Sequence, residues 1–249
     1  MKLPPLPMID LARYATLSPE LKRRALERHR SGGGSWSYDP ARGKSKDAFQ
    51  ATTPLDLAMR ETSWPQIAAD IIRACSHGSE QRDSNLEVAK LLFDWVSEND
   101  IRAVEYSLPS LALGKIAQVR YWENLLFEWR GHRYALFLDH RRGNGLRGKH
   151  SDASRFVFSA MHHHVRSIDP SFAGYRMAIF RFPLQDDGTR FVEHCTDDGI
   201  EHYSFDQLDA MVADTYRVWR EVCEAKRAAS ATSEPDVETP LETLWRRKS

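Results

Sequence analysis

Apolar residues at helical spacing dominate the first hundred positions of the chain. Ser18-Pro19-Glu20 predicts a helix start, because serine can cap the open amide groups and proline suits the first turn. Trp64-Pro65 predicts another start. Asn85 is expected to cap a helix over residues 86–98, where apolar residues recur every three or four positions. Residues 36–50 are polar and irregular, which predicts an exposed loop.

After residue 100 the pattern becomes typical of strands. Residues 102–106 alternate between polar and apolar side chains, as a half-buried strand does. Two apolar runs, 125–129 and 134–138, lie on either side of Arg130-Gly131-His132 and predict a β-hairpin. The second run is almost wholly apolar, so we expect it at the centre of a sheet, covered on both faces.

A covered helix, two further strands and a long helix complete the predicted core. Ser151 or Asp152 is expected to cap the first of these helices, and Ser204 the last. Between them, residues 175–182 and 190–195 predict strands. The order of elements from residue 85 onward is therefore α-β-β-β-α-β-β-α.

This order predicts an α/β (α+β) fold, with a mixed central β-sheet flanked by helices. We divide the chain into a helical N-terminal region over 1–84, a core over 85–228 and a disordered tail over 229–249. The tail is rich in Ala, Ser, Thr, Glu and Pro, a composition that buries little apolar surface.

Composition changes this picture little. The 249 residues carry 35 basic and 35 acidic side chains, so net charge gives no evidence for binding to nucleic acid or membrane. Cys75, Cys195 and Cys223 are far apart and form no CxxC pair, which fits a reducing compartment. No apolar run approaches the roughly 20 residues that span a bilayer, and we expect a cytoplasmic protein without a membrane partner.

Local charge is more informative. Asp139 ends the apolar strand, and a loop with Gly143, Gly145 and Gly148 follows it. Glycines let main-chain amides approach a phosphate, and arginines can clamp it. The cations of this stretch predict a surface that binds the phosphates of a nucleic acid. The residues expected to make these contacts are Arg141, Arg142, Arg147, Lys149, Arg155 and Arg166.

The order of elements, together with Glu123-Asn124 and Asp139-His140-Arg141, resembles the core of PD-(D/E)XK nucleases over residues 85–195. The resemblance implies a restriction-endonuclease-like sheet and metal-dependent phosphodiester cleavage. It implies that Glu123 and Asp139 hold Mg²⁺ and that Arg141 is the third catalytic residue. Arg141 stands where the family has lysine, and an arginine stays charged and cannot serve as a base.

Three alternatives stay open. The same scaffold could be a non-catalytic DNA-binding adaptor of a larger complex, contacting a protein partner through its N-terminal helices or its C-terminal tail around Trp245. Neutral net charge also allows a structural or interaction subunit with no role in nucleic acid. Asp139 itself could be a turn residue paired with Arg141 or Arg142, and the loop a solvated connection.

The run His162-His163-His164 suggests a metal site by composition alone. Consecutive helical residues point about 100° apart, so these three imidazoles cannot bind one ion together. Helical histidine ligands need a spacing of three or four residues, which is missing here. One of the three can still face the site as an acid, a base or a phosphate contact.

Overall fold

The computed structural model describes residues 3–29, 38–53, 62–115, 117–141 and 145–232. The helices are α1 (Met8–Ala15), α2 (Pro19–Arg28), α3 (Asp39–Gly43), α4 (Ser45–Ala48), α5 (Trp64–Ala74), α6 (Gly78–Glu98), α7 (Asp152–Ile168) and α8 (Phe205–Thr232), with a 3-10 turn η1 (Pro170–Gly174). The strands are β1 (Arg102–Glu105), β2 (Leu111–Leu113), β3 (Ala117–Val119), β4 (Leu125–Trp129), β5 (His132–Asp139), β6 (Arg176–Arg181) and β7 (Glu193–Thr196).

A five-stranded mixed sheet in the order β1-β4-β5-β6-β7 forms the centre of the molecule, and β2 and β3 make a separate pair. The pairs β1–β4, β4–β5 and β6–β7 are antiparallel, whereas β5 and β6 are parallel. A parallel pair needs a long crossover, and α7 supplies it between β5 and β6. Asp139 is the last residue of β5 and pairs in register with Arg181.

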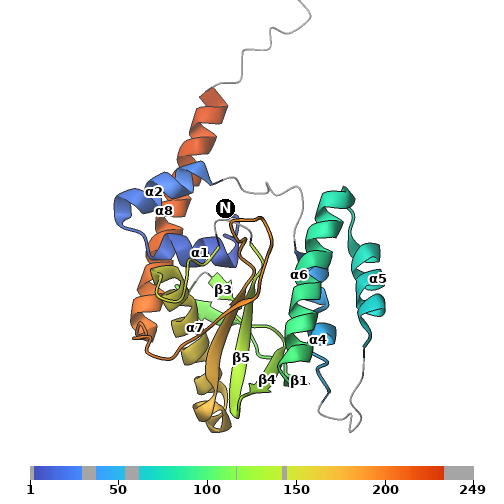
Figure 1. Ribbon diagram of the computed structural model, residues 1–249. Coiled ribbons are helices and arrows are strands. Elements are labelled where there is room, and N and C mark those ends of the chain that lie inside the picture. Colours follow the sequence, from blue (N-terminus) through green and yellow to red (C-terminus); the bar gives the residue numbers. More distant parts are fainter. Residues whose placement is uncertain (1–2, 30–37, 54–61, 116, 142–144, 233–249) are drawn as a thin grey trace, which may run out of the picture.

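Helices cover both faces of this sheet (Figure 1). Alternate residues of β5 belong to different cores, because successive strand side chains point to opposite faces. Ala135 and Phe137 pack with α1, α7 and α8, whereas Leu136 and Leu138 pack with α4 and α6. The sheet is thus buried on both faces, which explains the almost unbroken apolar run of its central strand.

The α/β class, the mixed central sheet, the hairpin and the central position of β5 are confirmed. The helix starts at residues 19 and 64 are confirmed as well. Ser151 is the cap of α7, since its hydroxyl oxygen accepts the Ser154 amide. Ser204 caps the first turn of α8 by accepting the Gln207 amide at 3.2 Å.

Two predicted elements are wrong. Residues 36–50 do not form an irregular loop where they are described, because α3 and α4 lie within them. Asn85 is not a helix start, since α6 already begins at Gly78. Instead the Asn85 side chain accepts the Ala41 amide at 2.9 Å and donates to the Gln81 carbonyl at 2.8 Å, so it satisfies the open end of α3 from the neighbouring helix.

The N-terminal region packs closely on the predicted core. Leu11 and Ala12 of α1 are fully or almost fully buried in the same cluster as α7 and α8. The division at residue 84 stays a prediction. α8 extends to Thr232, into the predicted tail, and residues 233–249 with Trp245 lie outside the described residues. Among the described residues, no helix has the length and apolar character needed to cross a membrane.

Candidate functional site

The Asp139 carboxylate binds the main chain of the loop that follows its strand. One oxygen accepts the Leu146 amide at 2.6 Å, and the other accepts the Arg141 amide at 3.1 Å. The residue is 1% exposed. Burial raises the pKa of Asp139 above its ordinary value, and the two amide donors offset that effect only in part. Asp139 therefore acts as a cap that holds the main chain of Arg141 and of Leu146 at the end of β5.

Gly145 makes room for this cap. A methyl group on its Cα would collide with one Asp139 carboxylate oxygen and crowd the other. The glycine thus allows the carboxylate to approach the loop closely, which is a role within the chain itself. Gly143 lies outside the described residues.

Arg141 is engaged by an acidic residue from the N-terminal region. Its guanidinium donates to both oxygens of Asp10 in α1, at 2.7 and 3.0 Å. The Asp10 side chain is 12% exposed and that of Arg141 is 29% exposed. This bidentate, partly buried pair ties the loop after β5 to α1.

The other predicted nucleic-acid contacts have varied surroundings. Arg142 lies outside the described residues. Arg147 is exposed, and Lys149 is half-buried beside a second hollow near β6 and β7.

Arg155 and Arg166 of α7 each have an internal partner. The Arg155 guanidinium lies 4.0 Å from the Tyr203 ring centre, and its Nε donates to the Glu201 carbonyl at 2.5 Å. Arg166 donates to the Tyr175 carbonyl at 3.5 Å. Arg155 is half-buried by these contacts, whereas Arg166 stays exposed.

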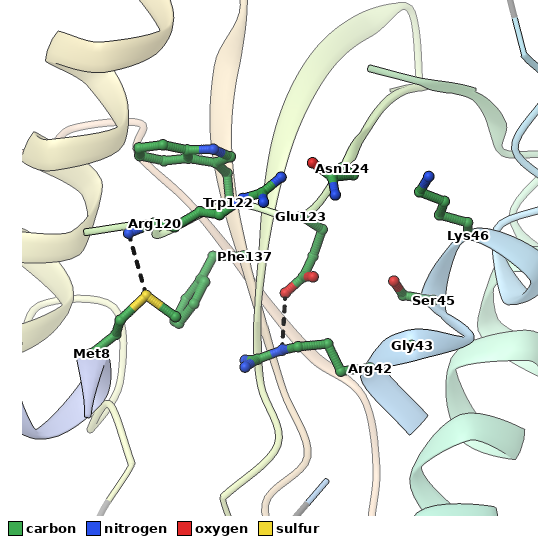
Figure 2. A pocket seen from close by; sticks show the side chains of 10 residues that line it. All are labelled: Met8, Arg42, Gly43, Ser45, Lys46, Arg120, Trp122, Glu123, Asn124 and Phe137. Carbon is green, nitrogen blue, oxygen red and sulfur yellow. Dashed lines mark hydrogen bonds and ion pairs between the residues drawn. The ribbon is translucent and has the colours of Figure 1, made fainter. Parts of the chain in front are cut away.

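Glu123 lines a pocket of about 280 Å³ between the sheet and the N-terminal helices (Figure 2). Its amide donates to the Leu136 carbonyl at 2.7 Å, which holds it beside β5. Its carboxylate faces Arg42 Nε at 3.4 Å, and Arg42 also donates to the Leu138 carbonyl at 2.9 Å. Burial raises the pKa of Glu123, and Arg42 works against that rise. The remaining lining residues are Met8, Gly43, Ser45, Lys46, Arg120, Trp122, Asn124 and Phe137.

The pocket is polar on one side. The buried Arg120 Nη2 and Asn124 Oδ1 atoms have no hydrogen-bond partner among the described residues. Lys46 is held at 2.6 Å by Glu105. Such a hollow can take a small polar molecule that satisfies these atoms.

The three consecutive histidines of α7 have three different sets of partners. His163 Nε2 lies 2.8 Å from the Tyr203 carbonyl, and His164 Nε2 lies 2.7 Å from the Pro109 carbonyl. Because a carbonyl only accepts, both contacts place the proton on Nε2. His162 points elsewhere, to Asp197 and His202, with one potential ligand atom from each within 4.8 Å of the others.

Sequence reasoning missed the residues that complete these sites. Asp10 and Arg42 come from N-terminal helices, far along the chain from the acids and cations that they pair with. Asp197 and His202 lie in the connection between β7 and α8, about 35 to 40 residues after His162. No local motif links these positions, so only the fold brings them together.

Two comparisons with known proteins bear on this chain. The family described as sliding clamp-binding bacterial toxin SocB matches residues 9–229. A curated relative, the DNA replication inhibitor toxin SocB of Caulobacter vibrioides (strain NA1000 / CB15N), is 32% identical over 226 residues, which cover 91% of this chain and 93% of that protein. No solved structure matches the chain.

These matches overturn the predicted family and function. The resemblance to PD-(D/E)XK nucleases is wrong, and so are the nuclease and the DNA-binding adaptor that were predicted from it. The family's described partner is a protein, the sliding clamp, and the predicted nucleic-acid partner is wrong. The resemblance was the reason to expect catalytic roles for Glu123, Asp139 and Arg141 and Mg²⁺ binding by the two acids. Without it, these roles have no support from a family. They stay predictions.

Proposed function

This chain belongs to the SocB family of sliding clamp-binding bacterial toxins, and from that premise we propose that it inhibits DNA replication by binding the sliding clamp. The clamp is a protein ring on which replication depends, so a protein that occupies its binding surface would stop elongation without altering DNA. The proposal requires that this chain has a surface that binds the clamp. It does not require that the chain catalyses a reaction.

The extent of the similarity carries the proposal. Residues 9–229 run from α1 nearly to the end of α8 and include every strand of both sheets. The relative covers 91% of this chain. Because both cores and both helical layers fall within the match, the similarity concerns a whole folded body and not a single shared motif.

The contacts of the loop after β5 support inhibition by binding. Asp139 is occupied by two main-chain amides, and Arg141 by the carboxylate of Asp10. Both side chains therefore stabilise the fold. A catalytic side chain, in contrast, would have to face a substrate. Of the alternatives left open by the sequence, an interaction protein with no role in nucleic acid lies nearest to this proposal.

Two finer predictions accompany the proposal. If the protein acts on the clamp, we expect it to work in the bacterial cytoplasm, where the chromosome is replicated. The restriction-endonuclease-like arrangement of the sheet stays a prediction about fold, separate from any nuclease activity.

A reconstituted elongation assay tests the proposed function. It uses a primed single-stranded template, polymerase, clamp loader and clamp, with increasing amounts of the purified full chain. We expect product length to fall with dose, and excess clamp to restore it while the template stays intact. Heat-unfolded chain is the control. Inhibition that excess clamp does not relieve, or a cut template, would contradict the proposal.

A further inference from the structure

Three side chains of types that can bind metal ions lie together outside the loop after β5. His162 comes from α7, Asp197 directly follows β7, and His202 precedes α8. One ligand atom from each lies within 4.8 Å of the other two, and His202 Nε2 lies 3.7 Å from Asp197 Oδ2. We propose that these three residues bind one divalent transition-metal ion, with Zn²⁺ as the best match.

The donor set argues for that class of ion. Imidazole nitrogen suits zinc and other late first-row metals, whereas Mg²⁺ and Ca²⁺ prefer sites built from oxygen alone. Two histidines and one carboxylate are a common set of three protein ligands for zinc, and the fourth position is then open to water.

The histidines also have unsatisfied atoms, which is an independent observation. Nδ1 of His162 and Nδ1 of His202 are both buried and have no hydrogen-bond partner among the described residues. Buried polar atoms nearly always have a partner, because leaving one unpaired costs free energy. An ion bound through Nδ1 would give these buried nitrogens the partner that they lack, and Nε2 of each ring would then carry the proton.

The fold holds the ligands in place from outside the group. The second Asp197 oxygen accepts the Met177 amide at 3.1 Å, which orients the carboxylate. Gly199 has a φ of +74°, and the Ile200 amide donates to the Asp197 carbonyl at 3.0 Å, so a tight turn leads back toward His202. Supporting contacts of this kind orient ligands in known metal sites.

Tyr203, the residue after His202, is hydrogen-bonded to α7 on both sides of its main chain. The Tyr203 amide donates to Ser159 Oγ at 2.9 Å, and the Tyr203 carbonyl accepts from His163 Nε2 at 2.8 Å. His202 is thereby held against His162, with the two ring centres 4.1 Å apart. His163 thus supports the site without being a ligand.

Binding requires a local rearrangement of the two rings. Their planes are inclined by 33°, close to stacking, whereas an ion lies in the plane of each imidazole that binds it. Rotation about the last side-chain torsion, which is broad for histidine, can turn both nitrogens toward a common point. The ion would then join α7 to the connection between β7 and α8.

Zinc binding by the full chain tests the proposal, which does not depend on clamp binding. The protein is purified without a histidine tag, stripped with EDTA and dialysed against Zn²⁺. We expect one tightly bound zinc per chain. At a hundredfold excess over the dissociation constant, the melting temperature should rise by roughly 5–10 °C, and EDTA should reverse that rise.

Matched variants separate this site from other histidines. His150→Ala removes an exposed histidine outside the group and should keep both the stoichiometry and the shift. His162→Ala should lose both. Asp197→Asn should also lose them, and it can still accept the Met177 amide, so it guards against a simple folding defect. Absence of bound zinc in the wild type, or unchanged binding in both His162→Ala and Asp197→Asn, would overturn the proposal.

Discussion

Replacing Asp139 by alanine should destabilise the fold because it removes the cap of the loop after β5. The substitution leaves the Leu146 and Arg141 amides without their acceptors, and the bond to Leu146 is buried. A hydrogen bond to a charged group contributes about 1.5–3 kcal/mol, and a buried donor left unpaired costs a similar amount. We therefore expect a loss of about 3–5 kcal/mol in the free energy of unfolding, a large part of the stability of an ordinary domain.

Urea unfolding followed by tryptophan fluorescence measures this loss, and hydrogen exchange at residues 145–147 locates it. Asp139→Asn keeps one acceptor oxygen, so its stability should lie between those of the wild type and Asp139→Ala. The Leu146 amide should exchange faster in both variants. A loss below about 1 kcal/mol for Asp139→Ala, with unchanged exchange at Leu146, would refute the capping role.

Two further predictions concern neighbouring charges. Arg141→Ala should lower the free energy of unfolding by about 1–3 kcal/mol, because it removes the ion pair with Asp10. A double-mutant cycle with Asp10→Ala, measured by urea unfolding, should show coupling between the two residues. Additive losses would argue against the pair. The pKa of His140 is held well below its ordinary 6.5 by burial and by Arg42 and Arg190, so below that pH the unfolded chain takes up a proton that the folded chain does not. Stability should fall as the pH drops below 6.5, and His140→Phe, which can keep the stacking on Tyr38 and Phe182, should lessen that fall. An identical pH dependence in the variant, measured by urea unfolding, would contradict the assignment.

The sheet was predictable because its pattern is local. An apolar run covered on both faces, a short turn and a second apolar run specify the β4–β5 hairpin within fifteen residues. Asn85 shows the limit of local reasoning. It has the residue type of a helix cap, yet its side-chain oxygen serves α3, 44 residues earlier in the chain. Only packing of the two helices makes that contact possible.

The site around Asp139 was likewise predictable from the sequence only in its local part. A buried acid at the end of β5, followed by glycines and cations, was correctly singled out as unusual from sequence. Its explanation depends on a glycine that accommodates the carboxylate and on Asp10, 131 residues away from Arg141. The order of elements resembled a nuclease core, but similar orders of elements serve many functions, so it could not specify this one.

Direct binding of the purified chain to the purified sliding clamp is the measurement closest to the central claim. The clamp is immobilised, and folded chain is titrated over it, with double-stranded DNA immobilised on a parallel surface. The account predicts saturable binding to the clamp and none to the DNA. Folded chain that fails to bind the clamp, or that binds DNA in its place, would contradict it.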